Sequence, residues 1–82
     1  MYYVYIIYSK IADRYYVGYC SDITNRIEKH NLGATPSTKP YRPWVLMYFE
    51  TFSNKSEAIK REKEIKNKKS RKYIENLITS NG

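Results

Sequence analysis

Cysteine is almost absent from this sequence, and its scarcity excludes two kinds of architecture. Cys20 is the one cysteine among 82 residues, so the chain can form neither an intramolecular disulfide nor a cysteine-rich zinc site. Such usage is typical of a reducing compartment, and we expect a cytoplasmic protein. Because Cys20 lies in a run of residues typical of a strand, we predict a small buried side chain rather than a reactive thiol.

Long apolar runs and repetitive tracts are also missing. The apolar run near the N-terminus covers only Tyr2 to Tyr8, with no positive region before it and no cleavage signal. It therefore predicts neither a secretion signal nor a membrane span. A chain of 82 residues with 41% hydrophobic content has room for one small core. We expect a single domain over residues 1–82.

Acidic residues are scarce relative to basic ones. The chain has 15 Lys and Arg against 8 Asp and Glu, which gives a net charge of +7. This balance favours polyanionic partners, with nucleic acid ahead of an anionic membrane surface. A soluble domain with a lysine-rich exterior accounts for the charge equally well. Charge therefore indicates a class of partner but no reaction.

Tyrosine-rich, β-branched segments predict an N-terminal hairpin. The segment Tyr2–Tyr8 is β-branched and aromatic on both alternating faces, as a central strand with a layer packed on each side requires. Polar residues from Ser9 to Asp13 interrupt the pattern, and Arg14–Cys20 resumes it as a second strand. Gly18 lies inside this second strand, so we expect another backbone or a ligand to approach it closely.

A helix follows the hairpin and carries two candidate functional residues. Ser21 and Asp22 are good N-cap residues, and Gly33 suits the left-handed position after the helix C-terminus. At about 100° per residue, Arg26 and His30 fall at the border of the apolar stripe. Both side chains are therefore expected to face the sheet.

The rest of the chain predicts a loop and a third strand. The segment Gly33–Arg42 has prolines among small polar residues, which predicts a mobile loop carrying Lys39 and Arg42. Alternating apolar residues then predict a strand over Trp44–Phe52. That alternation places Trp44, Leu46 and Tyr48 on one face and Val45, Met47 and Phe49 on the other.

Two helices complete the predicted fold. Asn54 and Glu57 form a capping-box pattern that starts a helix reaching Asn67, and residues 71–78 form a short last helix. The order strand, strand, helix, strand, helix, helix predicts an α+β domain. Its core is a three-stranded antiparallel sheet flanked by helices, which is about the minimum for independent stability.

Glu62 is an anomaly on the second helix. It lies within the apolar stripe formed by Ala58, Ile59 and Ile65. A carboxylate at such a position is destabilising unless something pairs with it. One reading is a salt bridge to Lys or Arg at the edge of the core. The other is a metal ligand, because a hard divalent cation is often held by one carboxylate, waters and substrate phosphate.

Tyr5 and Tyr16 are the most notable of the ten tyrosines. Tyrosine favours strands, so packing explains an arbitrary one in most cases. These two lie on the hairpin near Gly18 and close to the helix that bears Arg26. His30 also has a structural reading, since an imidazole near a helix C-terminus complements the helix dipole.

Spaced motifs in the chain resemble the GIY-YIG nuclease superfamily. Tyr3-Val4-Tyr5 and Tyr16-Val17-Gly18 are similar to the two tripeptides that name it, with tyrosine in place of the first glycine. The leading tyrosines of the two motifs, Tyr5 and Tyr16, are eleven positions apart.

The resemblance extends to both helices. Arg26 follows the second motif's tyrosine by ten positions and precedes His30 by four, as on the family's first helix, and Glu62 matches its metal-binding glutamate. The likeness covers Tyr2 to about Leu77. It is strongest to the short stand-alone bacterial members related to the nuclease domain of the nucleotide-excision repair excinuclease.

The resemblance implies metal-dependent, endonuclease-type hydrolysis of DNA phosphodiesters, in DNA repair or recombination. Glu62 would hold one Mg²⁺ or Mn²⁺, and Arg26 would neutralise the charge that builds on the phosphoryl oxygens. Tyr16 would orient or deprotonate the attacking water, and Tyr5 would hydrogen-bond the nucleophile or the phosphate. His30 would be a phosphate contact or a proton shuttle.

DNA is the expected partner, selected by structure rather than sequence and bound with low affinity by the domain alone. A protein partner would supply targeting, and no membrane partner is expected. Two other readings stay open: a catalytically weak or silent nucleic-acid-binding module with the same fold, and a small interaction domain with an incidental basic face. The expected phosphate contacts are Lys39, Arg42, Lys60, Lys63, Lys66, Lys69, Arg71 and Lys72.

Overall fold

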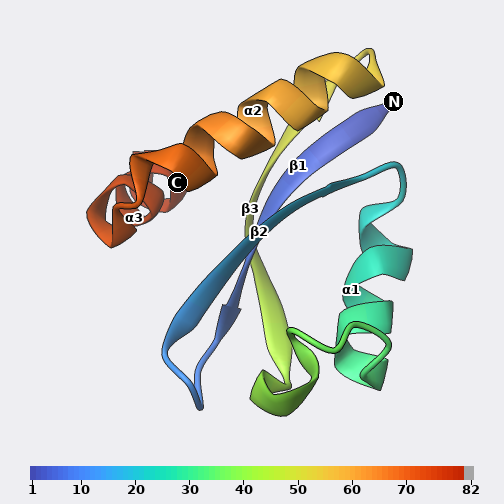
Figure 1. Cartoon of the computed structure of the whole chain (residues 1–82), viewed down its shortest axis with the longest axis vertical. Helices are drawn as coiled ribbons and strands as arrows, with labels where there is room; N and C mark the ends of the chain where they lie inside the picture. Colours follow the sequence, from blue (N-terminus) through green and yellow to red (C-terminus); the bar gives the residue numbers. More distant parts are fainter. Residues whose placement is uncertain (81–82) are drawn as a thin grey trace.

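The protein is an α+β fold in the predicted order of elements. A computed structural model describes residues 1–80 (Figure 1). Strand, strand, helix, strand, helix, helix follow one another, with one additional 3₁₀ turn before the third strand. The elements are β1 (Tyr2–Ser9), β2 (Arg14–Cys20), α1 (Ile23–Leu32), η1 (Lys39–Tyr41), β3 (Trp44–Phe52), α2 (Lys55–Lys68) and α3 (Arg71–Ser80).

β1 is the middle strand of the sheet, as its two apolar faces predicted. The sheet has three antiparallel strands in the order β2-β1-β3. Figure 1 shows α1 on one side of this sheet and α2 with α3 on the other. Val4 and Ile6 face α2 and α3, whereas Tyr5 and Ile7 face α1. Because both faces of β1 are covered, none of these four side chains is in contact with bulk solvent.

The alternation predicted for β3 is wrong at its centre. Consecutive residues of β1 pair with Tyr48 and Leu46, so Met47 is an extra residue in β3. Such a bulge reverses the side on which the following side chains point. Trp44 and Leu46 therefore pack in the core beneath α1, whereas Tyr48 packs in the core beneath α2 and α3.

The ends of α1 follow the capping residues read from the sequence. The Asp22 side chain accepts a hydrogen bond from the Asn25 N–H at 3.1 Å. Gly33 has φ of 82° and donates its N–H to the carbonyl oxygen of His30 at 3.2 Å. Within residues 1–80, no helix is both long enough and apolar enough to cross a membrane.

The connection from α1 to β3 is tied to the core, although its composition predicted a mobile loop. It contains the 3₁₀ turn η1 and the buried side chain of Thr38. The indole Nε1 of Trp44 donates to the carbonyl oxygen of Thr38 at 2.9 Å. The hydroxyl of Ser9 donates to the carbonyl oxygen of Tyr41 at 2.6 Å. Two hydrogen bonds to buried side chains thus hold the connection against β1 and β3.

Candidate active site

A cleft of about 350 Å³ opens along the β2 edge of the sheet. Residues from β1, β2, the start of α1 and the start and middle of α2 line it. It brings together four of the residues singled out in the sequence, namely Tyr5, Tyr16, Arg26 and Glu62. The fifth, His30, lies directly behind Tyr5 and is hydrogen-bonded to it.

Gly18 explains how a side chain of the central strand reaches an edge cleft. Gly18 on β2 is directly opposite Tyr5 on β1. A Cβ atom at Gly18 would lie 2.5 Å from the Tyr5 hydroxyl oxygen and 2.7 Å from its ring carbon Cζ. The Tyr5 ring therefore extends across β2 only because glycine leaves that space open. The close neighbour expected at Gly18 is this side chain, not a backbone or a ligand.

A line of buried polar side chains runs from the cleft into the protein. The Tyr5 hydroxyl oxygen lies 2.9 Å from Nε2 of His30, and Nδ1 of His30 lies 2.8 Å from Oγ1 of Thr38. Each of the three residues is 1% exposed. With both ring nitrogens engaged, His30 reaches the cleft through Tyr5 and not by direct contact.

Tyr5 and His30 are both uncharged in this environment. Burial lowers the pKa of His30, and the positive charge of Arg26 lowers it further. Burial also raises the pKa of the Tyr5 hydroxyl, and the neighbouring Tyr16 adds to the rise. A neutral imidazole thus meets a neutral phenol at neutral pH.

Tyr16 and Arg26 form the more open part of the cleft. The Tyr16 ring packs edge-on against His30, with 5.1 Å between ring centroids, and against Trp44 at 6.3 Å. The ammonium of Lys66 lies 5.7 Å from the Tyr16 ring centroid. Arg26 is exposed on α1, and within residues 1–80 it makes no ion pair. Its guanidinium is therefore available to an anion in the cleft.

Glu62 combines features of both readings proposed from its place on the helix. Its side chain is 14% exposed and accepts a hydrogen bond from Nζ of Lys66, one turn along α2, at 3.3 Å. The ion pair does not turn Glu62 away from the tyrosines, because Glu62 lines the same cleft as Tyr5 and Tyr16. The carboxylate is thus held at the cleft by a single exposed lysine.

The donor set in the cleft fits a hard divalent cation held mainly by water and substrate. Glu62 is the one carboxylate among the described residues that line it. Residues 1–80 contain no group of three His, Cys, Asp or Glu side chains that could hold a metal by themselves. Mg²⁺ commonly binds through one or two carboxylates, waters and substrate phosphate oxygens, whereas a structural zinc site needs four protein ligands.

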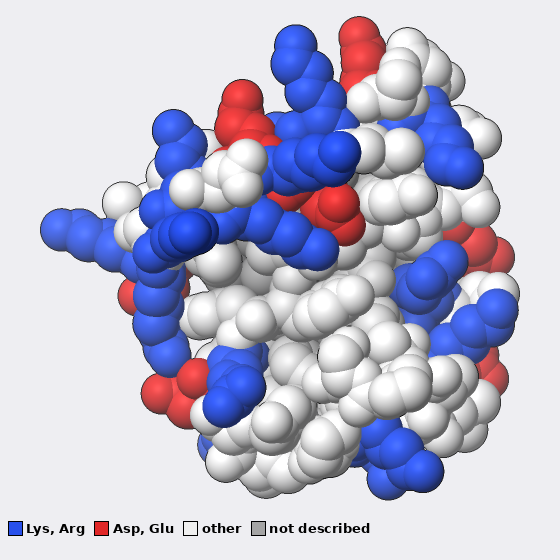
Figure 2. Space-filling model, in the orientation of Figure 1, with Lys and Arg blue, Asp and Glu red and all other residues white. Residues whose placement is uncertain are grey.

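The predicted phosphate contacts are all exposed, but they occupy different parts of the molecule. Figure 2 shows Lys and Arg side chains crowded over α2 and its α3 end, with fewer acidic groups among them. Lys55, at the start of α2, lines the cleft itself and was not among the residues predicted. On α2 lie Lys60, Lys63 and Lys66, at the α2–α3 junction Lys69, Arg71 and Lys72, and in the α1–β3 connection Lys39 and Arg42.

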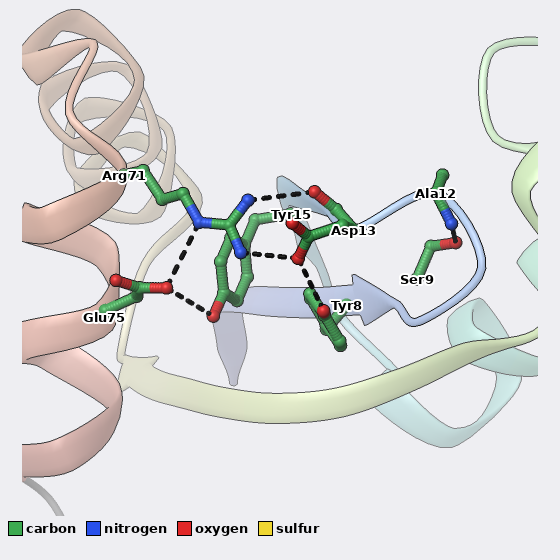
Figure 3. Close-up of polar contacts among 7 residues, drawn as sticks. All are labelled: Tyr8, Ser9, Ala12, Asp13, Tyr15, Arg71 and Glu75. Atoms are coloured by element: carbon green, nitrogen blue, oxygen red, sulfur yellow. Dashed lines mark hydrogen bonds and ion pairs between the residues drawn. The ribbon is translucent and has the colours of Figure 1, made fainter.

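Arg71 differs from the other basic residues because its charge is matched within the protein (Figure 3). Its guanidinium donates to the Asp13 carboxylate at 2.6 Å and to the Glu75 carboxylate at 3.1 Å. The hydroxyls of Tyr8 and Tyr15 donate to the same two carboxylates, at 2.6 Å and 3.3 Å. Arg71 therefore joins the start of α3 to the β1–β2 hairpin.

Thr38 and Lys66 are the neighbours whose contacts sequence reasoning missed. Thr38 lies in a run of small polar residues without periodicity, so no pattern indicated that its side chain meets His30. Lys66 was identified only as a phosphate contact, although its spacing of four from Glu62 is the spacing of a helical ion pair. That spacing is the signal that could have predicted the pair.

Comparison with known proteins assigns the class. Residues 1–74 match the family model described as the GIY-YIG catalytic domain. The chain therefore belongs to the GIY-YIG family, within a superfamily of nucleases, as the spaced motifs predicted.

Its relatives include proteins named UPF0213. The chain is 49% identical over 65 residues to a UPF0213 protein of Staphylococcus haemolyticus, and 51% identical over 65 residues to one of Staphylococcus saprophyticus, with 78% of each chain covered in both cases. The solution NMR structure of a UPF0213 protein from Bacillus halodurans is 36% identical and superposes with a TM-score of 0.62. That match covers 100% of this chain and 87% of the other.

Proposed function

We propose that this protein is a divalent-metal-dependent endonuclease that hydrolyses DNA phosphodiester bonds in the cleft along β2. The observation that carries the proposal is the convergence of Tyr5, Tyr16, Arg26 and Glu62 on one cleft from four different elements. Membership of the GIY-YIG family supports phosphodiester hydrolysis as the reaction of these residues.

Each side chain has a role that suits its surroundings. Glu62 would hold Mg²⁺ or Mn²⁺, which when bound supplies a Lewis acid for a phosphate oxygen. Arg26, without a carboxylate partner in residues 1–80, would neutralise charge building on the phosphoryl oxygens. Tyr16 would orient the attacking water. Tyr5 would hydrogen-bond the water or the phosphate.

His30 acts as a proton acceptor behind Tyr5 in this proposal. It is 1% exposed, and its hydrogen bond to the cleft lining is made to the Tyr5 hydroxyl, which supports a proton shuttle over a phosphate contact. Tyr5 would take a proton from the attacking water while its own hydroxyl proton passes to Nε2. Hydroxide, neutral Tyr5 and an imidazolium result, so protons and charge balance.

DNA binding would rest on exposed basic side chains rather than on base contacts. Lys55 and Arg26 line the cleft, and further lysines follow along α2. Contacts of this kind position a duplex without reading its sequence, so we expect weak binding governed by DNA structure. Repair or recombination would supply branched or nicked substrates, and a protein partner would deliver them.

Cleavage of a branched or nicked DNA substrate with Mg²⁺ or Mn²⁺ tests the proposal. Glu62→Gln and Arg26→Gln should each lower the rate by about 100-fold or more, and EDTA should abolish it. Glu57→Gln on α2 and Lys29→Gln on α1 change charge equally on the same helices, at exposed side chains without an ion pair in residues 1–80, and should cleave normally. Rates unaffected by Glu62→Gln and Arg26→Gln would refute the assigned site.

A second candidate function is a nucleic-acid-binding module without turnover. The ion pair between Glu62 and Lys66 favours it, because a lysine already satisfies the one cleft carboxylate. This candidate predicts a DNA mobility shift at low salt together with no cleavage of any branched, nicked or single-stranded substrate in either metal.

A further inference from the structure

Tyr5, His30 and Thr38 are joined by two buried hydrogen bonds, and Thr38 determines which group is the donor in each. We propose that Thr38 is a positioning residue that holds His30 in its Nδ1–H tautomer. The Tyr5 hydroxyl then donates to Nε2 and keeps its oxygen lone pairs toward the cleft. This inference rests on the proposed nuclease function and names a residue that neither the family motifs nor the spacing of the sequence indicated.

The hydrogen-bond count favours this tautomer. With the proton on Nδ1, that N–H donates to Thr38 Oγ1 at 2.8 Å, and the Thr38 hydroxyl is free to donate to the Thr35 carbonyl oxygen at 3.3 Å. The remaining nitrogen, Nε2, then accepts from the Tyr5 hydroxyl at 2.9 Å. All three contacts are satisfied together, each with one donor and one acceptor.

The opposite tautomer satisfies fewer contacts. With the proton on Nε2, the imidazole donates to the Tyr5 oxygen, and Thr38 must donate its only hydroxyl hydrogen to Nδ1. The hydrogen bond from the Thr38 hydroxyl to the Thr35 carbonyl oxygen is then lost, and only the backbone hydrogen bond between the two residues remains. The Thr38 side chain is 1% exposed, so giving up its hydrogen bond to the Thr35 carbonyl oxygen is destabilising, because water does not readily replace it.

Thr38 is itself held from both sides, which makes it suitable for orienting another group. Its carbonyl oxygen accepts from the Trp44 indole at 2.9 Å, and its N–H donates to the Thr35 carbonyl oxygen at 3.1 Å. Trp44 is the first residue of β3 and is buried. The Thr38 hydroxyl thus has a defined position relative to the sheet.

Whether the Tyr5 hydroxyl donates to Nε2 of His30 or accepts from it decides whether Tyr5 can relay a proton. As a donor to Nε2, Tyr5 passes its hydroxyl proton to an unprotonated nitrogen when it takes a proton from water. In the opposite tautomer Nε2 already carries a proton, and this transfer has no acceptor. A residue eight positions from His30 in the sequence, outside the cleft, therefore controls whether Tyr5 can relay a proton.

His30 is the one histidine of the chain, so its tautomer can be read without assignment ambiguity. Long-range ¹H–¹⁵N NMR at neutral pH should show a protonated Nδ1 and an unprotonated Nε2 in the wild type. Thr38→Val, which keeps the shape and removes the hydroxyl, should move the population toward Nε2–H, and Thr38→Ser should restore Nδ1–H. A wild type with Nε2–H, or a folded Thr38→Val with an unchanged tautomer, overturns the inference.

Tyr5→Phe separates the influence of Thr38 from that of Tyr5, and it also decides the matter if Thr38→Val fails to fold. Loss of the Tyr5 hydroxyl should leave Nδ1–H dominant, because Thr38 still accepts from it. A switch to Nε2–H in Tyr5→Phe would assign control to Tyr5 and overturn the inference.

Cleavage kinetics test the catalytic consequence separately. Thr38→Val should lower kcat by about 10-fold or more with KM little changed, and Thr38→Ser should recover most of that loss. A Thr38→Val variant with a switched tautomer and normal kcat overturns the relay role. A wild type that cleaves no substrate refutes the nuclease proposal instead, and leaves the tautomer measurement as a separate result.

Discussion

At the residue scale, Gly18 and Tyr5 work as a pair across two strands. The space over Gly18 is filled by the end of the Tyr5 ring, which is 1% exposed and hydrogen-bonded to His30. The ring therefore has little freedom to move aside. Glycine is needed at this position because it has no side chain; any side chain there would occupy the space of the Tyr5 ring.

Gly18→Ala should damage both stability and cleavage. The new Cβ would lie 2.5 Å from the Tyr5 hydroxyl oxygen, so either the ring or the strand must shift. We expect a loss of about 1–3 kcal/mol in the free energy of unfolding, measured in urea, and a lower cleavage rate. In a Tyr5→Leu background the same change should be much less destabilising. Equal destabilisation in both backgrounds would contradict the clash.

His30 predicts a pH dependence of stability between pH 7 and pH 5. Because its pKa is lowered in the folded protein, the His30 imidazole binds a proton more readily in the unfolded chain than in the folded one. Stability is therefore full above about pH 6.5, the usual imidazole pKa, and falls as the pH is lowered below it. The slope has an upper limit of about 1.4 kcal/mol per pH unit.

Urea unfolding at pH 7, 6 and 5 measures this slope, with His30→Gln as the control. The variant lacks the only histidine, so its stability should change little over this range. The pKa values of Glu50 and Asp13 are also lowered, but carboxylates lose their contribution only below about pH 4.5. Identical slopes for the two proteins would contradict the assignment to His30.

The sequence could predict which residues share the cleft but not what lies behind it. Tyr5, Tyr16, Arg26 and Glu62 follow from a spaced family pattern, which encodes their proximity without any knowledge of the fold. Thr38 follows from no pattern, because its contact with His30 depends on the path of an irregular connection. Irregular backbone has no period from which a side-chain direction can be read.

At the element scale, two consecutive residues of α2 point to different neighbours. Arg61 contacts β3, and Glu62 lines the cleft. Arg61 forms two hydrogen bonds with the Glu50 carboxylate of β3, at 2.9 Å and 3.0 Å, and one with the Tyr73 hydroxyl of α3 at 3.2 Å. Both partners of the ion pair are about one-fifth exposed. Arg61 therefore anchors α2, and that anchor sets the position of Glu62.

Arg61→Met should lower stability by about 1–3 kcal/mol, because it leaves the half-buried Glu50 carboxylate without its partner. Thermal and urea unfolding measure the loss. Lys60→Met is the matched control: Lys60 is exposed and makes no ion pair within residues 1–80. A loss as large for Lys60→Met would show that added surface hydrophobicity, not the ion pair, is responsible.

Strand prediction succeeded for β1 and β2 and failed in part for β3. In β1 and β2 the pairing is continuous, so alternation along the sequence matches alternation in space. In β3 the extra residue Met47 breaks that correspondence. A bulge adds one residue without a characteristic composition here, and the position at which the faces exchange cannot be read from hydrophobicity alone.

At the scale of the whole molecule, the net charge of +7 is unevenly available to a polyanion. Arg71 and Arg61 are each matched by two carboxylates, whereas Arg26 and Lys63 have no such partner in residues 1–80. Basic residues with the same formal charge therefore differ in how readily they can pair with a phosphate. Net charge predicts attraction, but the ion pairs decide where on the surface it acts.

The salt dependence of DNA binding should reflect this difference. Lys63→Gln and Arg71→Gln remove the same formal charge. Lys63→Gln should reduce the slope of log K against log salt concentration by about 0.9, whereas Arg71→Gln should leave the slope nearly unchanged. Arg71→Gln alone should lower the melting temperature, since it breaks the link between α3 and the hairpin. Fluorescence anisotropy between 50 and 200 mM salt measures the slopes, and equal reductions would show that binding follows net charge only.

The central position of β1 has a consequence for how the cleft can adapt. Tyr5 stands on the strand that is paired on both sides, so the base of the cleft opens only when the sheet itself comes apart. Amide protons beside Tyr5 should accordingly be among the slowest to exchange with solvent. The side chains that would meet a bent or branched substrate, Arg26 and Glu62, lie instead on the helices beside that strand.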